Sequence, residues 1–162
     1  KSVKNNICQP KALLAPLVLT GLVLDEKQYT VIPMVGSSKT QEPIIEKIVF
    51  GGFGKNSDLE NLDIKDAILI VERGSDIEGE LLFFSIKEMN AAKAGAKALI
   101  VYNNQPGIFL GELIHEFSEP GYTPQIPVVS IDREEGLEII KTIERKSLGI
   151  MKNPHIKLSK FR

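Results

Sequence analysis

Acidic and imidazole side chains that lie close together in the chain are the first candidates for chemistry. Within eight residues the chain carries Glu112, His115, Glu116 and Glu119, a spacing that could place several metal ligands on one helical face. His115 and Glu116 begin like the zinc motif H-E-x-x-H, but position 119 is glutamate where the second histidine is required. A solvated acidic loop explains this cluster better than a zinc site, and weak calcium binding is the alternative that stays open.

Nucleophilic catalysis needs an activated serine, threonine or cysteine beside a base. The histidines are His115 and His155, and no serine stands in a G-x-S-x-G motif. The single cysteine, Cys8, lies in a polar N-terminal stretch and is better explained as an incidental thiol than as a nucleophile. We therefore predict no catalytic residue in this chain.

Two further patterns resemble functional motifs but have simpler explanations. Residues 51–55 read Gly-Gly-Phe-Gly-Lys like the end of a phosphate-binding loop, yet Asn56 stands where serine or threonine would reach magnesium, and residues 56–65 are predicted to be a loop. The neighbouring carboxylates Glu134 and Glu135 fall in the predicted first turn of a helix, where negative charge favours the helix dipole. We predict no cofactor and no bound metal.

Composition limits the remaining functions. The 162 residues, 43% of them hydrophobic, suffice for one domain with a full apolar core. The formal net charge of −1, without a long run of either sign, disfavours binding to nucleic acid. The uncharged stretch 12–24 near the N-terminus has thirteen residues, fewer than the roughly 20 of a membrane-spanning helix, so we predict no membrane insertion by this segment. The chain begins at Lys1, which suggests a segment of a longer protein.

Strands and turns are predicted for the first third of the chain. The runs 17–24 and 29–35 are rich in Val, Leu and Ile and flank a polar tetrapeptide, so they predict a β-hairpin with its loop at 25–28. A third apolar run, 44–50, ends at the glycines of 51–54, which predict a turn or bulge.

From residue 65 onward the pattern alternates between strand and helix. The apolar run 67–71 predicts a strand covered on both faces. Ser85 and Glu88 have the spacing of a capping box, and the helix that follows should end at Gly95. Residues 96–102 predict a second buried strand, parallel to the first.

The last part of the chain adds a third strand, a helix and a tail. Residues 126–131 predict the strand, and Asp132 with Glu135 predicts the start of a helix with Leu137, Ile140 and Ile143 on its apolar face. The tail 155–161 alternates like an edge strand. Two exposed loops are expected, at 74–83 and at 103–125, and long ordered loops often carry function.

The central block resembles the protease-associated (PA) domain. The residues that carry this resemblance are Asp58 and Leu59, Ile64 to Gly74, Phe84, Lys87, Asn90 to Asn104 and Ile126 to Ile131. The resemblance implies an α/β fold: a layered β/β/α PA-type domain with a mixed strand-rich sheet or open barrel and two principal flanking helices. It divides the chain into an N-terminal flank at 1–43 with a hairpin that packs on the domain, a PA core at 44–146, and a C-terminal flank at 147–162.

The family resemblance also implies a function. PA domains are non-catalytic insertions, so we expect a protein- or peptide-interaction module that influences substrate selection, access or stability in a subtilisin-like serine peptidase. The expected partners are the catalytic domain of that peptidase and a protein or peptide substrate, and the expected location is extracellular or at the cell surface. The alternatives are a stand-alone or metal-assisted hydrolase that uses His115, and a cargo-sorting module.

Loop residues are the candidates for contact with a peptide or protein. They are Arg73, Phe83, Asn103, Asn104, Phe109 and Tyr122. Aromatic side chains on loops are often satisfied by packing beneath the loop, which is the competing explanation for these.

Overall fold

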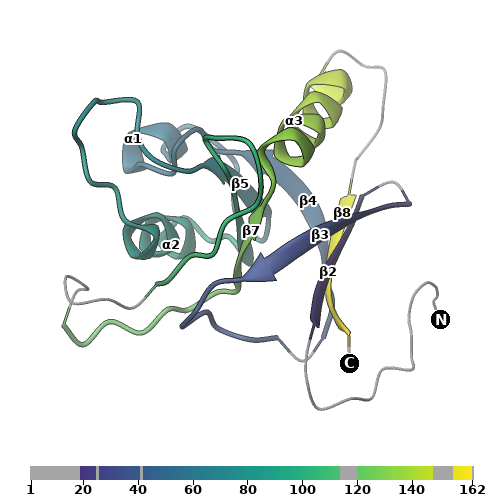
Figure 1. Cartoon of the computed structure of the whole chain (residues 1–162), viewed down its shortest axis with the longest axis horizontal. Coiled ribbons are helices and arrows are strands. Elements are labelled where there is room, and N and C mark those ends of the chain that lie inside the picture. The colour runs from purple at the N-terminus through teal and green to yellow at the C-terminus, as the bar shows by residue number, and fades with distance from the viewer. Residues whose placement is uncertain (1–18, 25, 41, 114–119, 148–154, 162) are drawn as a thin grey trace.

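The computed structural model describes residues 19–24, 26–40, 42–113, 120–147 and 155–161 (Figure 1). The strands are β2 (Leu19–Leu24), β3 (Lys27–Pro33), β4 (Ile44–Phe50), β5 (Ile68–Glu72), β6 (Ala98–Tyr102), β7 (Val128–Ile131) and β8 (His155–Phe161). The helices are α1 (Asn56–Leu59), α2 (Phe84–Lys93) and α3 (Arg133–Ser147). These elements give the α/β PA-type fold that the sequence predicts, with α2 and α3 as its principal helices.

The strands form one mixed sheet that closes on itself. Among the described strands the order is β2-β3-β7-β6-β5-β4-β8, and β8 returns to β2. The strands β4, β5, β6 and β7 run parallel to one another, whereas β2, β3 and β8 join them by antiparallel pairing. The predicted parallel pairing of the two strands that flank α2 is therefore confirmed.

The C-terminal strand β8 is not an edge strand, in contrast to the prediction. It pairs with β2 on one side and with β4 on the other, so both rows of its backbone groups are used. Alternating residues predict a strand with one covered face, but they carry no information on how many neighbours the strand has. The position of β8 within the closed sheet is decided by the tertiary structure.

The predicted hairpin is confirmed, with a shorter turn. Leu24 pairs with Lys27, so Lys27 and Gln28 belong to β3 and not to the loop. Glu26 lies in this turn with a φ of 69°, in the left-handed region. A tight turn of this kind matches the twist of the two strands that it joins.

Successive residues of the parallel strands supply two different cores. Ile68 and Ile70 of β5 point into the first, which the barrel interior shares with α3. Leu69 and Val71 point into the second, which lies under α1 and α2. In Figure 1, α1 and α2 lie together on one side of the sheet, and α3 lies apart from them. Because successive side chains of a strand face opposite ways, one apolar run fills both layers.

The ends of both principal helices follow local sequence signals. The α2 helix stops before Gly95, whose φ of 96° provides the left-handed residue that the sequence predicts. At the start of α3 the Asp132 carboxylate accepts a hydrogen bond from the Glu135 amide at 3.1 Å, which confirms the predicted cap. Among the described residues, no helix is both long enough and apolar enough to cross a membrane.

Candidate functional site

The parallel strands bring their carboxyl ends to one edge of the sheet. Phe50, Glu72, Tyr102 and Ile131 are the last residues of β4, β5, β6 and β7. The segments that follow these strands therefore lie next to one another at this edge. In sheets of parallel strands this is the edge at which ligands usually bind.

A groove opens beside this edge. It has a volume of about 240 Å³, below the range of roughly 300–1,000 Å³ that is usual for a drug-sized ligand. The residues that line it are Arg73, Gly74, Glu80, Leu81, Leu82, Phe83, Phe84, Asn104 and Glu112. Its size suits one or two side chains of a larger partner and not a whole cofactor.

The Arg73 side chain is held in place by aromatic rings and an amide. Its guanidinium carbon lies 4.5 Å from the ring centre of Phe109 and 6.0 Å from that of Phe84. Its Nη1 donates a hydrogen bond to Oδ1 of Asn103 at 3.2 Å. Among the described residues no carboxylate forms an ion pair with Arg73. A planar guanidinium fixed in this way is suited to recognition of carboxylates and carbonyls.

Asn103 and Phe109 support the groove and do not line it. Asn103 is buried, and its Nδ2 donates to the Gly107 carbonyl oxygen at 2.9 Å. Phe109 is also buried, and its ring stacks on Phe84 with 5.5 Å between the centres. The interpretation of Phe109 as an available apolar contact is therefore wrong, because the loop folds back and packs this ring beneath Arg73.

The other predicted contact residues lie in two places. Asn104 and Phe83 line the groove together with Arg73. Tyr122 lies elsewhere, where its hydroxyl donates to Oε1 of Glu88 at 2.7 Å. Burial and this hydrogen bond raise the pKa of Tyr122. Tyr122 thus holds a loop against α2.

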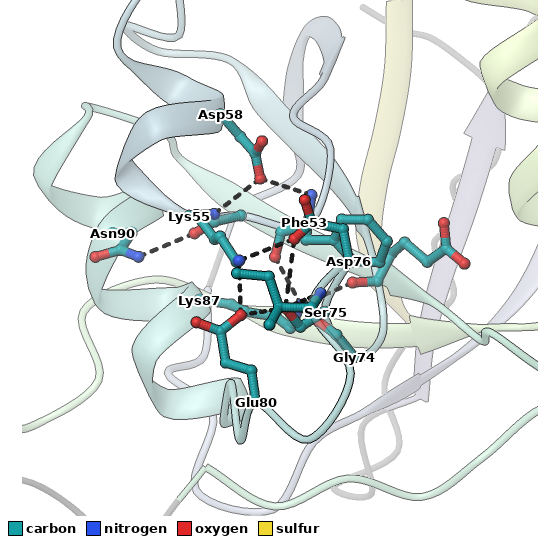
Figure 2. Close-up of polar contacts among 12 residues, drawn as sticks. Phe53, Lys55, Asp58, Gly74, Ser75, Asp76, Glu80, Lys87 and Asn90 are labelled. Carbon is teal, nitrogen blue, oxygen red and sulfur yellow. Dashed lines mark hydrogen bonds and ion pairs between the residues drawn. The ribbon is translucent and has the colours of Figure 1, made fainter.

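Sequence reasoning missed the buried cation Lys87. Its side chain is fully buried, and its Nζ donates to the carbonyl oxygens of Phe53 at 2.6 Å, Glu72 at 2.8 Å and Gly74 at 2.7 Å (Figure 2). Asn90, one turn later on α2, donates from Nδ2 to the Gly54 carbonyl oxygen at 2.9 Å. The signal that the sequence offered was a lysine among the apolar positions of a short helix. A lysine buried at such a position needs partners for its ammonium, because lysine is almost never fully buried unless it is paired.

The glycine-rich segment 51–54 forms the predicted turn, in which the Gly54 amide donates to the Gly51 carbonyl oxygen. The one-turn helix α1 follows it, so the prediction of an uninterrupted loop at 56–65 is wrong. The Asp58 carboxylate accepts hydrogen bonds from the Phe53 and Lys55 amides, at 2.9 and 3.2 Å (Figure 2). A carboxylate of the chain thus occupies the donors that a phosphate would need.

The predicted capping box at the start of α2 is also wrong. The N-cap residue is Phe83, whose side chain makes no capping hydrogen bond. The buried Glu88 carboxylate instead accepts from the amides of Gln125 at 2.6 Å and Ile126 at 3.0 Å. A glutamate can take part in a local capping box or accept hydrogen bonds from backbone amides that are distant in the sequence. In this fold it binds the distant amides.

Charged side chains also link the loops to the sheet. Lys55 forms ion pairs with Asp76 at 2.8 Å and with Glu80 at 2.6 Å, and these contacts raise the pKa of Lys55. Arg133, the first residue of α3, donates to Glu72 Oε2 and to the Asn103 carbonyl oxygen, both at 3.1 Å. The edge is therefore held mainly by polar contacts.

The residues behind the metal-site hypothesis fall almost entirely outside the described part of the chain. Residues 114–119, with His115, Glu116 and Glu119, are not described, and neither is Cys8. Glu112 is exposed at the rim of the groove. Within the described ranges, no group of three His, Cys, Asp or Glu side chains is placed to hold a metal ion.

The proteins that resemble this chain include two curated relatives and one solved structure. The minor extracellular protease Vpr of Bacillus subtilis is 31% identical over 98 residues, which are 60% of this chain and 10% of the relative. The C5a peptidase of Streptococcus pyogenes is 28% identical over 144 residues, which are 85% of this chain and 11% of the relative. The zinc aminopeptidase BSAP of B. subtilis matches 92% of this chain and 32% of its own, with a TM-score of 0.67 and 24% identity.

Each of these matches covers only a part of the relative. The chain spans about a tenth of the length of the two curated relatives, at 10% and 11%, and 32% of the aminopeptidase. The likeness to the aminopeptidase is one of fold. The model of the PA domain matches residues 44–139, which are more than half of the chain. The fold, the parallel strands with their ordered edge, and this match together place the chain in the PA domain family.

Proposed function

We propose that this domain is a non-catalytic interaction module of a peptidase, and that its groove contacts a protein or peptide substrate. The observation that carries the proposal is the fixed Arg73 guanidinium, which lies against the stacked rings of Phe84 and Phe109 and lines the groove. A side chain that is already ordered loses little further freedom when a ligand binds, which favours recognition.

The walls of the groove combine apolar and polar surface. Leu81 is 76% exposed, and Leu82, Phe83 and Phe84 continue this apolar wall. Asn104 and Glu112 add polar groups to the lining. Apolar walls with a few placed polar groups are the usual composition of a ligand-binding site.

The relatives and the family support a peptidase as the host of the domain. The similar proteins include two peptidases and one aminopeptidase, so the expected partner is the catalytic domain of a peptidase. Within that class we propose a subtilisin-like serine peptidase that acts outside the cell or at its surface, as the family resemblance implies. In this setting the groove would influence which substrates reach the active site.

The first experiment tests catalysis by the isolated chain. The purified protein is incubated with casein and with ester substrates, with and without added zinc and calcium. The expected result is no turnover above the rate without protein. Turnover that a His115→Ala substitution abolishes would contradict the proposal and would favour a metal-assisted hydrolase.

The second experiment locates binding. Short overlapping casein peptides are titrated into labelled protein, and the backbone amide shifts are followed by NMR. We expect peptides that bind to shift the amides of Arg73, residues 81–84 and Asn104. Arg73→Gln should weaken binding at least about tenfold, which corresponds to about 1.4 kcal/mol.

The matched control is Arg145→Gln, because Arg145 lies on α3 and its contact is with Thr142 of the same helix. This variant should bind the peptides like the wild type. Equal weakening by both substitutions would point to a general effect of charge and would remove the groove from the proposal.

A further inference from the structure

The Lys87 ammonium has no free hydrogen-bond donor. A protonated lysine has three N–H donors and no acceptor, and here the carbonyl oxygens of Phe53, Glu72 and Gly74 receive them at 2.6, 2.8 and 2.7 Å. Within the described ranges no carboxylate forms an ion pair with Lys87. The charge of Lys87 is therefore used to hold backbone.

The acceptors differ in how firmly the rest of the fold holds them. Glu72 is part of β5 and pairs with Tyr102 of β6. Phe53 is held by the bond from its amide to the Asp58 carboxylate at 2.9 Å. Gly74 follows β5, and the largely exposed segment 75–81 begins directly after it. Of these acceptors, the Gly74 carbonyl depends most on Lys87.

Gly74 also shapes the groove. It has a φ of 88°, and a Cβ atom at this position would lie 2.9 Å from Nδ2 of Asn104. Gly74 and Asn104 both line the groove, as does Arg73. A movement of the Gly74 carbonyl would therefore change the groove wall and the direction of Arg73.

We propose that the Lys87 ammonium is a charge-dependent pin for the Arg73–Gly74 bend, so that the groove keeps its shape while Lys87 is protonated and relaxes when this side chain becomes neutral. The effect on ligand binding rests on the proposed function of the groove. The effect on the bend stands without it.

The chemistry of the amine gives the reason. A neutral amine has two N–H donors and one lone pair, so it cannot satisfy the three carbonyl oxygens that now surround Lys87. One carbonyl then faces a lone pair and loses its bond. The least restrained carbonyl, that of Gly74, is the one expected to move.

The surroundings of Lys87 bring this event into an accessible pH range. Burial lowers the pKa of Lys87 to about 8. The charged groups that face it from the packed elements are Asp58 on α1, Glu72 on β5, Glu80 on the following loop and Lys55 before α1. The three carboxylates raise the pKa and Lys55 lowers it, but burial is the largest effect.

The test is an NMR titration of the free protein from about pH 6 to about pH 10, which spans this range. The Cε–Hε signals of Lys87 report its protonation, and the amides of Gly74 and Ser75 report the bend. We expect both sets of signals to titrate with one midpoint near 8. Lys87→Met should show the high-pH signals of Gly74 at every pH.

The matched control is Lys93→Met, because Lys93 is exposed and lies on the same helix. This variant should titrate like the wild type. The proposal is overturned if Lys87 titrates without movement of Gly74 and Ser75, if Lys87 stays protonated up to about pH 10, or if Lys87→Met keeps the low-pH signals. If Lys87→Met does not fold, the wild-type titration decides alone.

Peptide binding separates this inference from the proposed function. The casein peptides are added at the lowest and at the highest pH of the titration, and we expect binding about tenfold weaker at the highest. Equal affinity at both pH values, while Lys87 titrates, overturns the pin as a control on the groove. Absence of binding at both overturns the proposed function, and the ligand-free titration still judges the pin.

Discussion

The two long helices are attached to the sheet in different ways. The α3 helix places Ile139 and Ile140 in the core of the barrel, with Leu137 and Ile143 packed beside them. The α2 helix contributes Ala91 to its core, but it also buries Ser85, Lys87, Glu88 and Asn90. Hydrophobic packing holds α3, whereas buried polar groups that bind the backbone of loops hold much of α2.

This difference shows how the fold orders its loops. Loops that run over the surface bury few apolar side chains, but their carbonyl and amide groups still need partners. Lys87 and Asn90 serve the carbonyls of the segments after β4 and β5, and Glu88 serves the amides of Gln125 and Ile126. The helix next to the groove therefore acts as a support for loops, and the other helix closes a core.

The largest effect is expected when the cation is removed from α2. Lys87→Met keeps the apolar stem but leaves buried carbonyls without donors, each at a cost of about 1–3 kcal/mol. We expect the free energy of unfolding to fall by about 4 kcal/mol in chemical denaturation at neutral pH. The exposed Lys93→Met should change it by less than about 0.5 kcal/mol. Similar values for the two variants would contradict the contrast between the helices.

The corresponding change on α3 removes apolar volume. Ile139 is fully buried, and Ile139→Ala should lower the free energy of unfolding by about 3 kcal/mol through lost burial and a cavity. Because this site is in the other core, the shifts of the groove amides should stay unchanged in an NMR spectrum. Movement of the Gly74 amide in this variant would show that the two layers are coupled.

A close approach of α3 to the sheet offers a sharper test of packing. A Cβ atom at Gly136 would lie 2.3 Å from Cβ of Tyr102. Gly136→Ala gains helix propensity of about 1 kcal/mol but forces the helix away from β6. We expect a net loss of about 2 kcal/mol in thermal or chemical unfolding. A stabilised variant would mean that packing does not fix the position of α3.

Substitutions at two glutamates compare a buried carboxylate that binds backbone amides with a carboxylate in a surface ion pair. Glu88→Gln keeps an acceptor for the Gln125 and Ile126 amides but loses the charge, so we expect a loss of about 1 kcal/mol and faster hydrogen exchange at these amides. Glu138→Gln removes an ion pair of α3 with Lys27, in which both side chains are about half exposed, and should cost less than about 0.5 kcal/mol. The order of the two losses in parallel denaturation curves is the check.

A further effect is a dependence of stability on pH. Since the pKa of Lys87 is about 8 in the folded protein and 10.5 in the unfolded chain, the unfolded state binds more protons between these values. The free energy of unfolding of the wild type should therefore rise with pH in this window relative to Lys87→Met, with a slope below about 1.4 kcal/mol per pH unit. Deprotonation removes the buried charge of Lys87, and this stabilises the folded state even though the bend at Gly74 loosens. If the free energy of unfolding of the wild type falls with pH relative to that of Lys87→Met, folding favours the protonated form of Lys87.

Local sequence patterns predicted most of the elements. The strands at Ile44–Phe50 and Ile68–Glu72, the end of α2 before Gly95 and the Asp132 cap all depend on residues close in the chain. The pairing of β8 on both sides could not be predicted, because a pattern of alternation describes the faces of a strand and not its edges.

The candidate site was predicted only in part. Arg73, Phe83 and Asn104 line the groove as the loops suggested, but Asn103 and Phe109 are buried behind it and Tyr122 is bound to Glu88. A residue type shows which contacts a loop side chain can make. Whether the side chain points outward or inward depends on how the loop folds back on the sheet.

The sequence by itself determined the α/β layering, because apolar periodicity, turn residues and caps act over a few neighbouring positions, and its central block carried the resemblance to the PA domain family. The tertiary structure alone decided the closure of the sheet through β8, the burial of Lys87 and the use of Glu88 as an anchor. The partners lie far apart in the chain: Leu19 pairs with Phe161, and Ile126 binds Glu88 from 38 positions away. Buried charges are placed where the packed chain leaves polar groups without water, and only the complete fold defines that place.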